Sequence, residues 1–147
     1  MKIIDNIINE KENETITNAL YKKYFNFYEK NCHLNLDDNF KYLDNLPKFY
    51  IDNIKNVLGR YFIITNSKDE LNEYAGIHWH RDGEKNELSV LLYLTGDFNK
   101  GGELMFKKKS MKFKINSMFV FNSFILHKVN KYYGDNIRLA IKWRFQI

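Results

Sequence analysis

From Arg60 to the C-terminus the chain is a series of short segments rich in Ile, Val, Phe and Tyr. These segments read RYFIIT, SVLLYLT, ELMFKK, MKFKI, SMFVFN, ILHKVN and IRLAIKWRF. The stretches between them, such as DGEKN, GDFNKGG and YYGDN, hold the Gly, Asn and Asp that tight turns favour. Short β-branched and aromatic runs separated in this way predict the strands of a β-sandwich or small barrel.

The residues before Gly59 have a helical periodicity instead. Residues 14–31 and 46–58 each place apolar side chains three or four positions apart, which predicts two amphipathic helices. The second helix is expected to begin at Asp44 or Asn45, because an Asx cap followed by Pro47 satisfies or removes free amide donors. Helices packed on one face of a sheet would give a fold of the α+β class.

The length and composition predict a single domain. A chain of 147 residues with 44% hydrophobic residues can bury one core. We expect residues 1–147 to form one domain, in which residues 1–59 give helical support and residues 60–147 form the β core. The net charge of +5 is scattered, with Lys107 to Lys109 as its one run. A nucleic-acid partner is therefore possible but not favoured.

The single cysteine and the N-terminal sequence predict where the protein resides. Cys32 cannot form an internal disulfide and suits a reducing compartment. The N-terminus turns acidic and polar too soon for a secretory signal, and no apolar run approaches the length of a membrane span. We expect a soluble, cytoplasmic protein with no membrane partner. The oligomeric state is not predicted.

Two histidines and an aspartate alternate in GIHWHRDGE, at His78, His80 and Asp82. In an extended strand these three side chains would share one face, with Trp79 and Arg81 on the other. Two imidazoles and a carboxylate are costly to bury without a partner. The alternation therefore predicts a candidate metal site, although a solvated strand end is the simpler interpretation.

His127 is a second candidate ligand. It lies in the apolar stretch FVFNSFILHKV, where a lone histidine is usually a core residue. If that strand reaches the H-x-D segment, His127 completes two histidines and one carboxylate. This is the facial triad of non-haem Fe(II) proteins, which leaves other coordination positions open.

Taken together, five ordered segments resemble the Fe(II)- and 2-oxoglutarate-dependent oxygenases, and within them the prolyl-hydroxylase-like branch. They are HRD at residues 80–82, LSVLLYLT ending at Thr95, GGELMF at residues 101–106, FVFNSFILHKV around His127, and RLAIKW from Arg138. The resemblance covers the chain from about Arg60 onward. It implies a double-stranded β-helix, or jelly-roll, core behind the supporting helices.

The resemblance also implies roles for single residues. His80, Asp82 and His127 would be the Fe(II) ligands, and Arg138 would form a salt bridge with the distal carboxylate of 2-oxoglutarate. A planar guanidinium suits that task because it binds a carboxylate through two hydrogen bonds. The hydroxyl of Tyr93 would help to hold the same cosubstrate.

One position departs from the pattern of the family. Ala140 stands where the family often has a serine, two residues after the arginine. We therefore expect the cosubstrate to lose one hydroxyl contact in this chain.

The activity implied is that of a dioxygenase using Fe(II), 2-oxoglutarate and O2, with ascorbate as a supporting reductant. Oxidative decarboxylation of the cosubstrate would release succinate and CO2 while an unactivated C–H bond is hydroxylated. The substrate implied is a prolyl residue, a peptide or an amino-acid-like small molecule. His78, Arg81 and Tyr74 are candidates for the substrate side of the site.

One further interpretation is rejected on the sequence, and two alternatives stay open. His78, His80, Glu84 and His127 have the spacing of a cupin site with three histidines and one glutamate, but the glycines and proline that cupins place before the last histidine are missing. Glu84, with Arg144 on the strand face of Arg138, is reminiscent of oxygenases that demethylate nucleic-acid bases. A non-catalytic β-helix module that binds a metal, a sugar or a partner is the second open alternative.

Overall fold

The computed structural model describes residues 1–73 and 75–147. In this part of the chain the helical segments are α1 (Glu10–Tyr24), α2 (Asn45–Tyr50) and the short 3-10 helices η1 (Phe25–Phe27), η2 (Asp38–Asp44) and η3 (Ala75–Ile77). The strands are β1 (Lys2–Ile4), β2 (Cys32–Asn35), β3 (Val57–Thr65), β4 (Glu87–Thr95), β5 (Leu104–Phe106), β6 (Lys109–Met111), β7 (Met118–Asn122), β8 (His127–Val129) and β9 (Arg138–Gln146).

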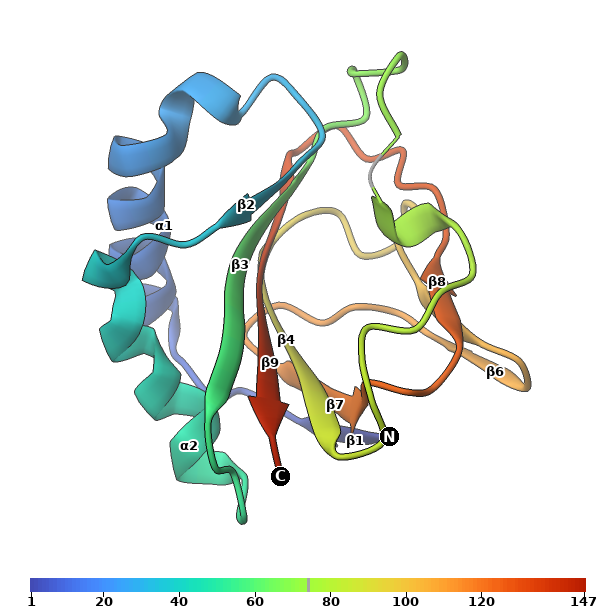
Figure 1. Ribbon diagram of the computed structural model, residues 1–147. Coiled ribbons are helices and arrows are strands. Elements are labelled where there is room, and N and C mark those ends of the chain that lie inside the picture. Colours follow the sequence, from blue (N-terminus) through green and yellow to red (C-terminus); the bar gives the residue numbers. More distant parts are fainter. Residues whose placement is uncertain (74) are drawn as a thin grey trace.

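The strands form two antiparallel sheets. The larger sheet has the order β1-β7-β4-β9-β3-β2 and the smaller one has the order β6-β5-β8. Helices α1 and α2 lie on the outer side of the larger sheet, and the smaller sheet lies on its other side (Figure 1). This arrangement confirms the expected α+β class, with a jelly-roll core and helices in its N-terminal part.

Helix α1 begins earlier and ends earlier than its apolar spacing predicts. It begins at Glu10 because Asn9 and Glu12 form a reciprocal capping box, in which each side chain accepts a hydrogen bond from the backbone N–H of the other residue. It ends at Tyr24 and continues only as η1. The prediction of helix as far as residue 31 is therefore wrong.

The second predicted helix is shorter than expected. Helix α2 begins at Asn45, as predicted, but the side chain of Asp44 makes no capping bond. The helix ends at Tyr50, and Val57 already pairs with Phe145 of β9. The prediction of helix to residue 58 is wrong because this pairing with β9 outweighs local helical spacing.

The first third of the chain is not only helical. Strand β1 pairs with β7 and strand β2 pairs with β3, so residues before Gly59 supply both edges of the larger sheet. The predicted strand MKFKI is also largely absent, since only its first residue, Met111, lies in a strand. The single-domain boundaries and the division at residue 59 stay predictions.

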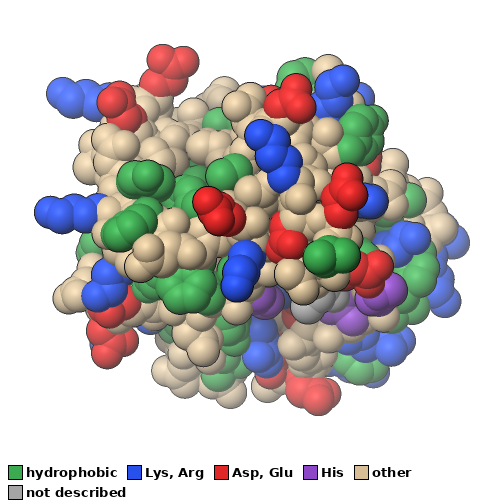
Figure 2. All heavy atoms as spheres, turned by 90° about the horizontal axis from the view of Figure 1, so that it is seen from above, with side chains coloured by type: hydrophobic (Ala, Val, Ile, Leu, Met, Phe, Trp, Pro, Cys, Tyr) green, Lys and Arg blue, Asp and Glu red, His purple; other side chains and the backbone are tan. Residues whose placement is uncertain are grey.

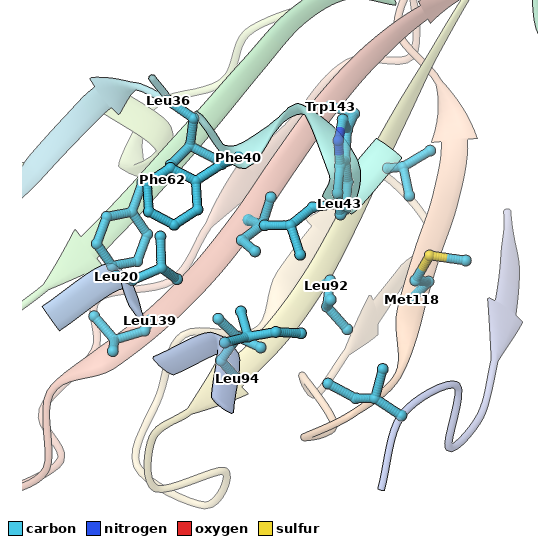
Figure 3. Packing of buried hydrophobic residues seen from close by; sticks show 14 of the residues in the cluster. Leu20, Leu36, Phe40, Leu43, Phe62, Leu92, Leu94, Met118, Leu139 and Trp143 are labelled. Carbon is cyan, nitrogen blue, oxygen red and sulfur yellow. The ribbon is translucent and has the colours of Figure 1, made fainter. Parts of the chain in front are cut away.

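Side chains along β9 point alternately into two different cores. Leu139, Ile141, Trp143 and Phe145 belong to the core between the larger sheet and the helices. Figure 3 shows part of this core, built from the labelled residues Leu20, Leu36, Phe40, Phe62, Leu43, Leu92, Leu94, Met118, Leu139 and Trp143. Ala140 belongs instead to the second core, between the two sheets. Polar residues that lie two positions before or after Ala140 on β9 are therefore directed into the space between the sheets.

In the described part of the chain, no helix combines the length and apolar character needed to cross a membrane.

Candidate metal centre

His80, Asp82 and His127 are brought together by backbone hydrogen bonds between two segments. The N–H of His80 donates to the carbonyl of His127 at 2.9 Å, and the N–H of His127 donates back at 3.0 Å. Two residues further on, the N–H of Asp82 donates to the carbonyl of Ser123 at 2.8 Å. The segment carrying H-x-D is therefore fixed against β8 and the turn before it.

The three side chains form a set suited to a metal ion. The Oδ1 atom of Asp82 lies 3.2 Å from Nε2 of His80 and 3.4 Å from Nε2 of His127. The candidate ligand atoms all lie within 4.8 Å of one another. Each Nδ1 donates to a backbone carbonyl at 2.7 Å, that of His78 for His80 and that of Ile125 for His127. These bonds orient both rings with Nε2 toward the metal position, as metal-binding histidines require.

Charge at this centre is concentrated on Asp82. Burial raises the pKa of this carboxyl, but hydrogen bonds from His127 and His80 and the charge of Lys142 outweigh burial and hold the pKa well below its usual range. The hydrogen bond with Asp82 raises the pKa of His80. The centre therefore presents an ionised carboxylate, which is the form that binds a cation.

A buried serine, Ser89, holds the other carboxylate oxygen and is itself in contact with a second buried serine. Ser89 on β4 donates a hydrogen bond of 2.7 Å to Oδ2 of Asp82, and its hydroxyl lies 2.8 Å from that of Ser123. Both serines are fully buried. Because Oδ2 is occupied in this way, Oδ1 is the oxygen turned toward the two imidazoles.

A cavity of about 150 Å³ lies beside the centre, between the two sheets. Its walls are mainly apolar, formed by Ile63, Leu91, Leu104, Phe121 and Val129. Its polar lining consists of the three candidate ligands together with His33, Arg138 and Lys142. Figure 2 shows histidine side chains reaching one side of the molecule, close to several Lys and Arg side chains.

Arg138 is a buried cation without a counter-charge. It is 3% exposed, and its guanidinium lies 5.2 Å from the ring centre of Tyr93 and 5.1 Å from that of Phe113. Its Nη1 donates weakly to the hydroxyl of Thr65 at 3.3 Å, and its Nε has no hydrogen-bond partner among the described residues. Within residues 1–73 and 75–147 no carboxylate pairs with it. Since an unpaired buried charge is costly, this position is suited to bind an anion.

Tyr93 also has an unused polar group beside Arg138. It is fully buried, and its hydroxyl finds no hydrogen-bond partner in the described part of the chain. Burial raises the pKa of this hydroxyl, which therefore keeps its proton. Tyr93 does not itself line the cavity, but its ring packs under the guanidinium that does. Ala140, directly opposite Tyr93 in the sheet, offers no hydroxyl, as the sequence indicates.

Of the residues expected on the substrate side, His78 and Arg81 do not line the cavity. His78 is exposed, lies 3.0 Å from Oε2 of Glu73 and does not line the cavity. Arg81 lies over the ring of Phe124, with its guanidinium carbon 4.7 Å from the ring centre. Tyr74 lies outside the described residues.

The predicted strand through residues 78–82 is also wrong. Only His80 takes part in a β-bridge, and the residues around it form turns and loops. His78 consequently does not share a face with His80 and Asp82. It contributes its backbone carbonyl to His80 rather than its imidazole.

Neither alternative site is assembled. Glu84 is exposed and does not line the cavity, so the cupin set of three histidines and one glutamate is incomplete. Arg144 is bound to Glu87 at 2.6 Å and does not line the cavity with Arg138.

Lys142 is the main site residue that the sequence interpretation missed. Its Nζ lies 2.8 Å from Oδ1 of Asp82, and the residue is 9% exposed. The signal was available, since Arg138, Ala140 and Lys142 alternate along one strand and must share a face. The serines at positions 89 and 123 carry no comparable sequence signal.

Known proteins share this fold and these motifs. Residues 70–144 match the family model of the 2OG-Fe(II) oxygenase superfamily. A search of curated protein sequences gave no significant match.

Three solved structures resemble the chain over nearly its whole length. A viral collagen prolyl hydroxylase from Paramecium Bursaria Chlorella virus-1, solved with 2OG, has a TM-score of 0.65 at 17% identity, over 99% of this chain and 95% of that one. A prolyl hydroxylase from Trichoplax adhaerens, solved with a peptide fragment of hypoxia inducible factor, has a TM-score of 0.71 at 17% identity, over 99% and 82%. HygX from Streptomyces hygroscopicus, solved with nickel and 2-oxoglutarate, has a TM-score of 0.67 at 11% identity, over 98% and 80%.

These likenesses confirm the double-stranded β-helix fold, which the chain shares with prolyl hydroxylases. The family match covers half of the chain and includes the three candidate ligands and Arg138. The donor set of two histidines and one carboxylate fits Fe(II), and the buried guanidinium beside it fits an anionic cosubstrate. The chain therefore belongs to the 2OG-Fe(II) oxygenase superfamily, whose enzymes use Fe(II), 2-oxoglutarate and O2.

Proposed function

We propose that this oxygenase hydroxylates an unactivated C–H bond of a prolyl, peptide or amino-acid-like substrate, with release of succinate and CO2. In this proposal His80, Asp82 and His127 hold Fe(II), and Arg138 holds the distal carboxylate of 2-oxoglutarate. The shared fold with a prolyl hydroxylase that was solved with a peptide supports a substrate of this class.

The observation that carries the proposal is the unpaired guanidinium of Arg138. It lines the same cavity as the three candidate ligands, and it is buried without a carboxylate partner among the described residues. A ligand that binds the metal at one end and carries a carboxylate at the other would connect the two positions. A planar guanidinium can bind such a carboxylate through two parallel hydrogen bonds.

The side chains of the chain position the reactants, and they need not act as acids or bases. Fe(II) with 2-oxoglutarate and O2 supplies the oxidising power for hydroxylation. Ser89 and the two backbone carbonyls fix the orientation of the three ligands, and the apolar walls keep water from the reacting atoms. The hydroxyl of Tyr93 is free to donate a hydrogen bond beside Arg138.

The test combines turnover with binding. The protein is incubated with Fe(II), 2-oxoglutarate and ascorbate under air, and succinate is measured with and without proline-containing peptides, free amino acids and methylated oligonucleotides. We expect succinate in the absence of substrate and a faster rate with a peptide or an amino acid. A protein that neither retains Fe(II) nor forms succinate would contradict the proposal, and stimulation by the oligonucleotides alone would favour base demethylation.

The Arg138→Met variant tests directly whether the guanidinium of Arg138 binds 2-oxoglutarate. Binding of 2-oxoglutarate to the Mn(II)-loaded protein is measured by calorimetry without O2. Loss of the guanidinium should weaken binding by about 30-fold or more, because a buried charge pair loses one partner. Lys128→Met is the matched control, because Lys128 lies next to His127 but contacts the ring of Trp79 and does not line the cavity. Equal losses in both variants would show a general effect of charge.

A further inference from the structure

Lys142 is a second buried cation in the cavity, and the proposed roles do not use it. It lines the cavity with Arg138, lies four residues further along the same face of strand β9, and is 9% exposed. Its Nζ lies 2.8 Å from Oδ1 of Asp82, the carboxylate oxygen that faces the two imidazoles. The ammonium group therefore contacts the carboxylate oxygen that is proposed to bind the metal.

The charges around the cavity do not balance once its proposed ligands are counted. This step rests on the proposed function. The two positive charges of Fe(II) and the one of Arg138 are offset by the carboxylate of Asp82 and the two carboxylates of 2-oxoglutarate. Lys142 then remains as a positive charge without a counter-charge of its own.

Among the described residues of the cavity, Lys142 has no acidic neighbour other than Asp82. Among the described residues that line the cavity, Asp82 is the one with a carboxylate. His33, which lines the cavity near Lys142, has its pKa lowered by burial and by the charge of Lys142, so it adds neither a negative charge nor a second positive one at neutral pH. A buried ammonium without a counter-charge is unfavourable, and an anion bound beside it would relieve that cost.

We propose that Lys142 binds a carboxylate of the substrate, so that this oxygenase acts on a free amino acid or related small acid whose carboxylate lies close to the hydroxylated carbon. The position of Nζ next to a metal ligand sets this closeness. The four-carbon stem of lysine allows its ammonium to turn from Asp82 to a ligand in the same cavity. A prolyl residue inside a protein chain has no charge to offer at that place. A C-terminal residue of a peptide does, and the experiment distinguishes the two sources.

The experiment measures binding without turnover. The protein is loaded with Mn(II) and 2-oxoglutarate in the absence of O2, and the relaxation of ligand protons by Mn(II) is followed by NMR. The probes are free L-amino acids and the same amino acids as α-amides, and short peptides with either a C-terminal carboxylate or a C-terminal amide. We expect at least one free amino acid to bind about tenfold or more tightly than its amide. If only the peptides bind more tightly as carboxylates than as amides, Lys142 binds a peptide C-terminus, and the proposal of a small-acid substrate is wrong.

Three variants test whether Lys142 causes the discrimination. In Lys142→Met the ratio of amino-acid to amide affinity should fall to about one, and in Lys142→Arg it should be largely kept. Lys128→Met removes the same charge from β8 of the smaller sheet, outside the cavity, and should keep the ratio. The ratio compares two ligands of one variant, so it is insensitive to a partial loss of folded protein.

Failure of this inference can be told apart from failure of the proposed function. If Mn(II) and 2-oxoglutarate bind but amino acids and amides bind equally, or neither binds, Lys142 does not bind a substrate carboxylate. If Lys142→Met weakens 2-oxoglutarate and leaves the ratio unchanged, the lysine belongs to the cosubstrate and the inference is wrong. If neither Mn(II) nor 2-oxoglutarate binds, the proposed function fails and the inference with it.

Discussion

At the scale of single residues, the carboxylate of Asp82 is the point at which the site converges. One oxygen accepts from Ser89, and the other faces His80, His127 and Lys142. Every contact of this side chain therefore serves either to orient it or to place a cation at Oδ1. Substitution of Asp82 should therefore impair metal binding, whereas substitution of His78 should not.

We predict that Asp82→Ala and His80→Ala each abolish retention of Fe(II), while His78→Ala largely preserves it. The imidazole of His78 is exposed, and what His78 gives the site is its backbone carbonyl, which the substitution keeps. The losses should exceed the roughly 10- to 100-fold that removal of an outer hydrogen-bond partner costs a metal site. Metal content after gel filtration measures this. Loss of iron from His78→Ala alone would show that the ligand assignment is wrong.

A second prediction concerns the unpaired hydroxyl of Tyr93. Without ligands, Tyr93→Phe should leave the free energy of unfolding unchanged or raise it by about 1 kcal/mol, because it removes a buried polar group that has no partner. Tyr132→Phe is the matched control. Its hydroxyl accepts from the N–H of Asp97 at 2.8 Å and donates to the carbonyl of Asn136 at 2.6 Å, so its loss should cost about 1–2 kcal/mol.

Urea denaturation measures both tyrosine variants, and the same samples test the role of Tyr93 toward the cosubstrate. Binding of 2-oxoglutarate should weaken in Tyr93→Phe and stay the same in Tyr132→Phe. A Tyr93→Phe protein that is destabilised like Tyr132→Phe and binds 2-oxoglutarate normally would contradict the proposed role.

At the scale of secondary structure, a buried ion pair connects the helical layer to the larger sheet. Asp44, at the end of η2, accepts from Nε of Arg60 on β3 at 2.7 Å, and also pairs with Nη2 of the same residue. It further accepts from the indole N–H of Trp143 on β9 at 2.9 Å. These bonds explain why Asp44 does not cap α2, since its oxygens are used for contacts between elements.

We predict that Asp44→Ala lowers the free energy of unfolding by about 3–5 kcal/mol, because it leaves the guanidinium of Arg60 buried without its partner. Asp52→Ala, which removes an exposed carboxylate from the loop after α2, should change it by less than about 0.5 kcal/mol. Chemical denaturation followed by circular dichroism compares the two. Similar small losses in both variants would show that the ion pair does not hold the layers together.

The same elements show which parts of the fold are readable from sequence. Strands β3, β4, β7 and β9 were predicted because β-branched and aromatic runs ended at clear turns. Strands β1 and β2 were not, since each is three or four residues long and gains its conformation from pairing with a distant strand. The triad and Arg138 were identified as candidates through motif order. Lys142 was passed over although it alternates with Arg138, because its partner Asp82 is 60 residues earlier and only folding brings them together.

At the scale of the whole molecule, the site lies across both sheets. His127 belongs to β8 of the smaller sheet, Arg138 and Lys142 belong to β9 of the larger one, and Asp82 lies on the loop that precedes β4. Helices α1 and α2 pack on the opposite face of the larger sheet and take no part in the site (Figure 1). Ligands bound in the cavity would therefore tie the two sheets to each other without touching the helical layer.

We predict that Mn(II) and 2-oxoglutarate together protect the site segments from hydrogen exchange much more than the start of α1. The amides of residues 78–83 and of β8 should gain most, because their hydrogen bonds join the metal ligands to one another. At ligand concentrations about 100 times Kd, global unfolding should also become less favourable by about 2.7 kcal/mol. Amides near Glu10 open locally at the helix end and should not report this gain. In Asp82→Ala, which serves as the control, both effects should vanish. Equal protection at Glu10 and at His127, or protection that persists in Asp82→Ala, would place the ligands somewhere other than between the sheets.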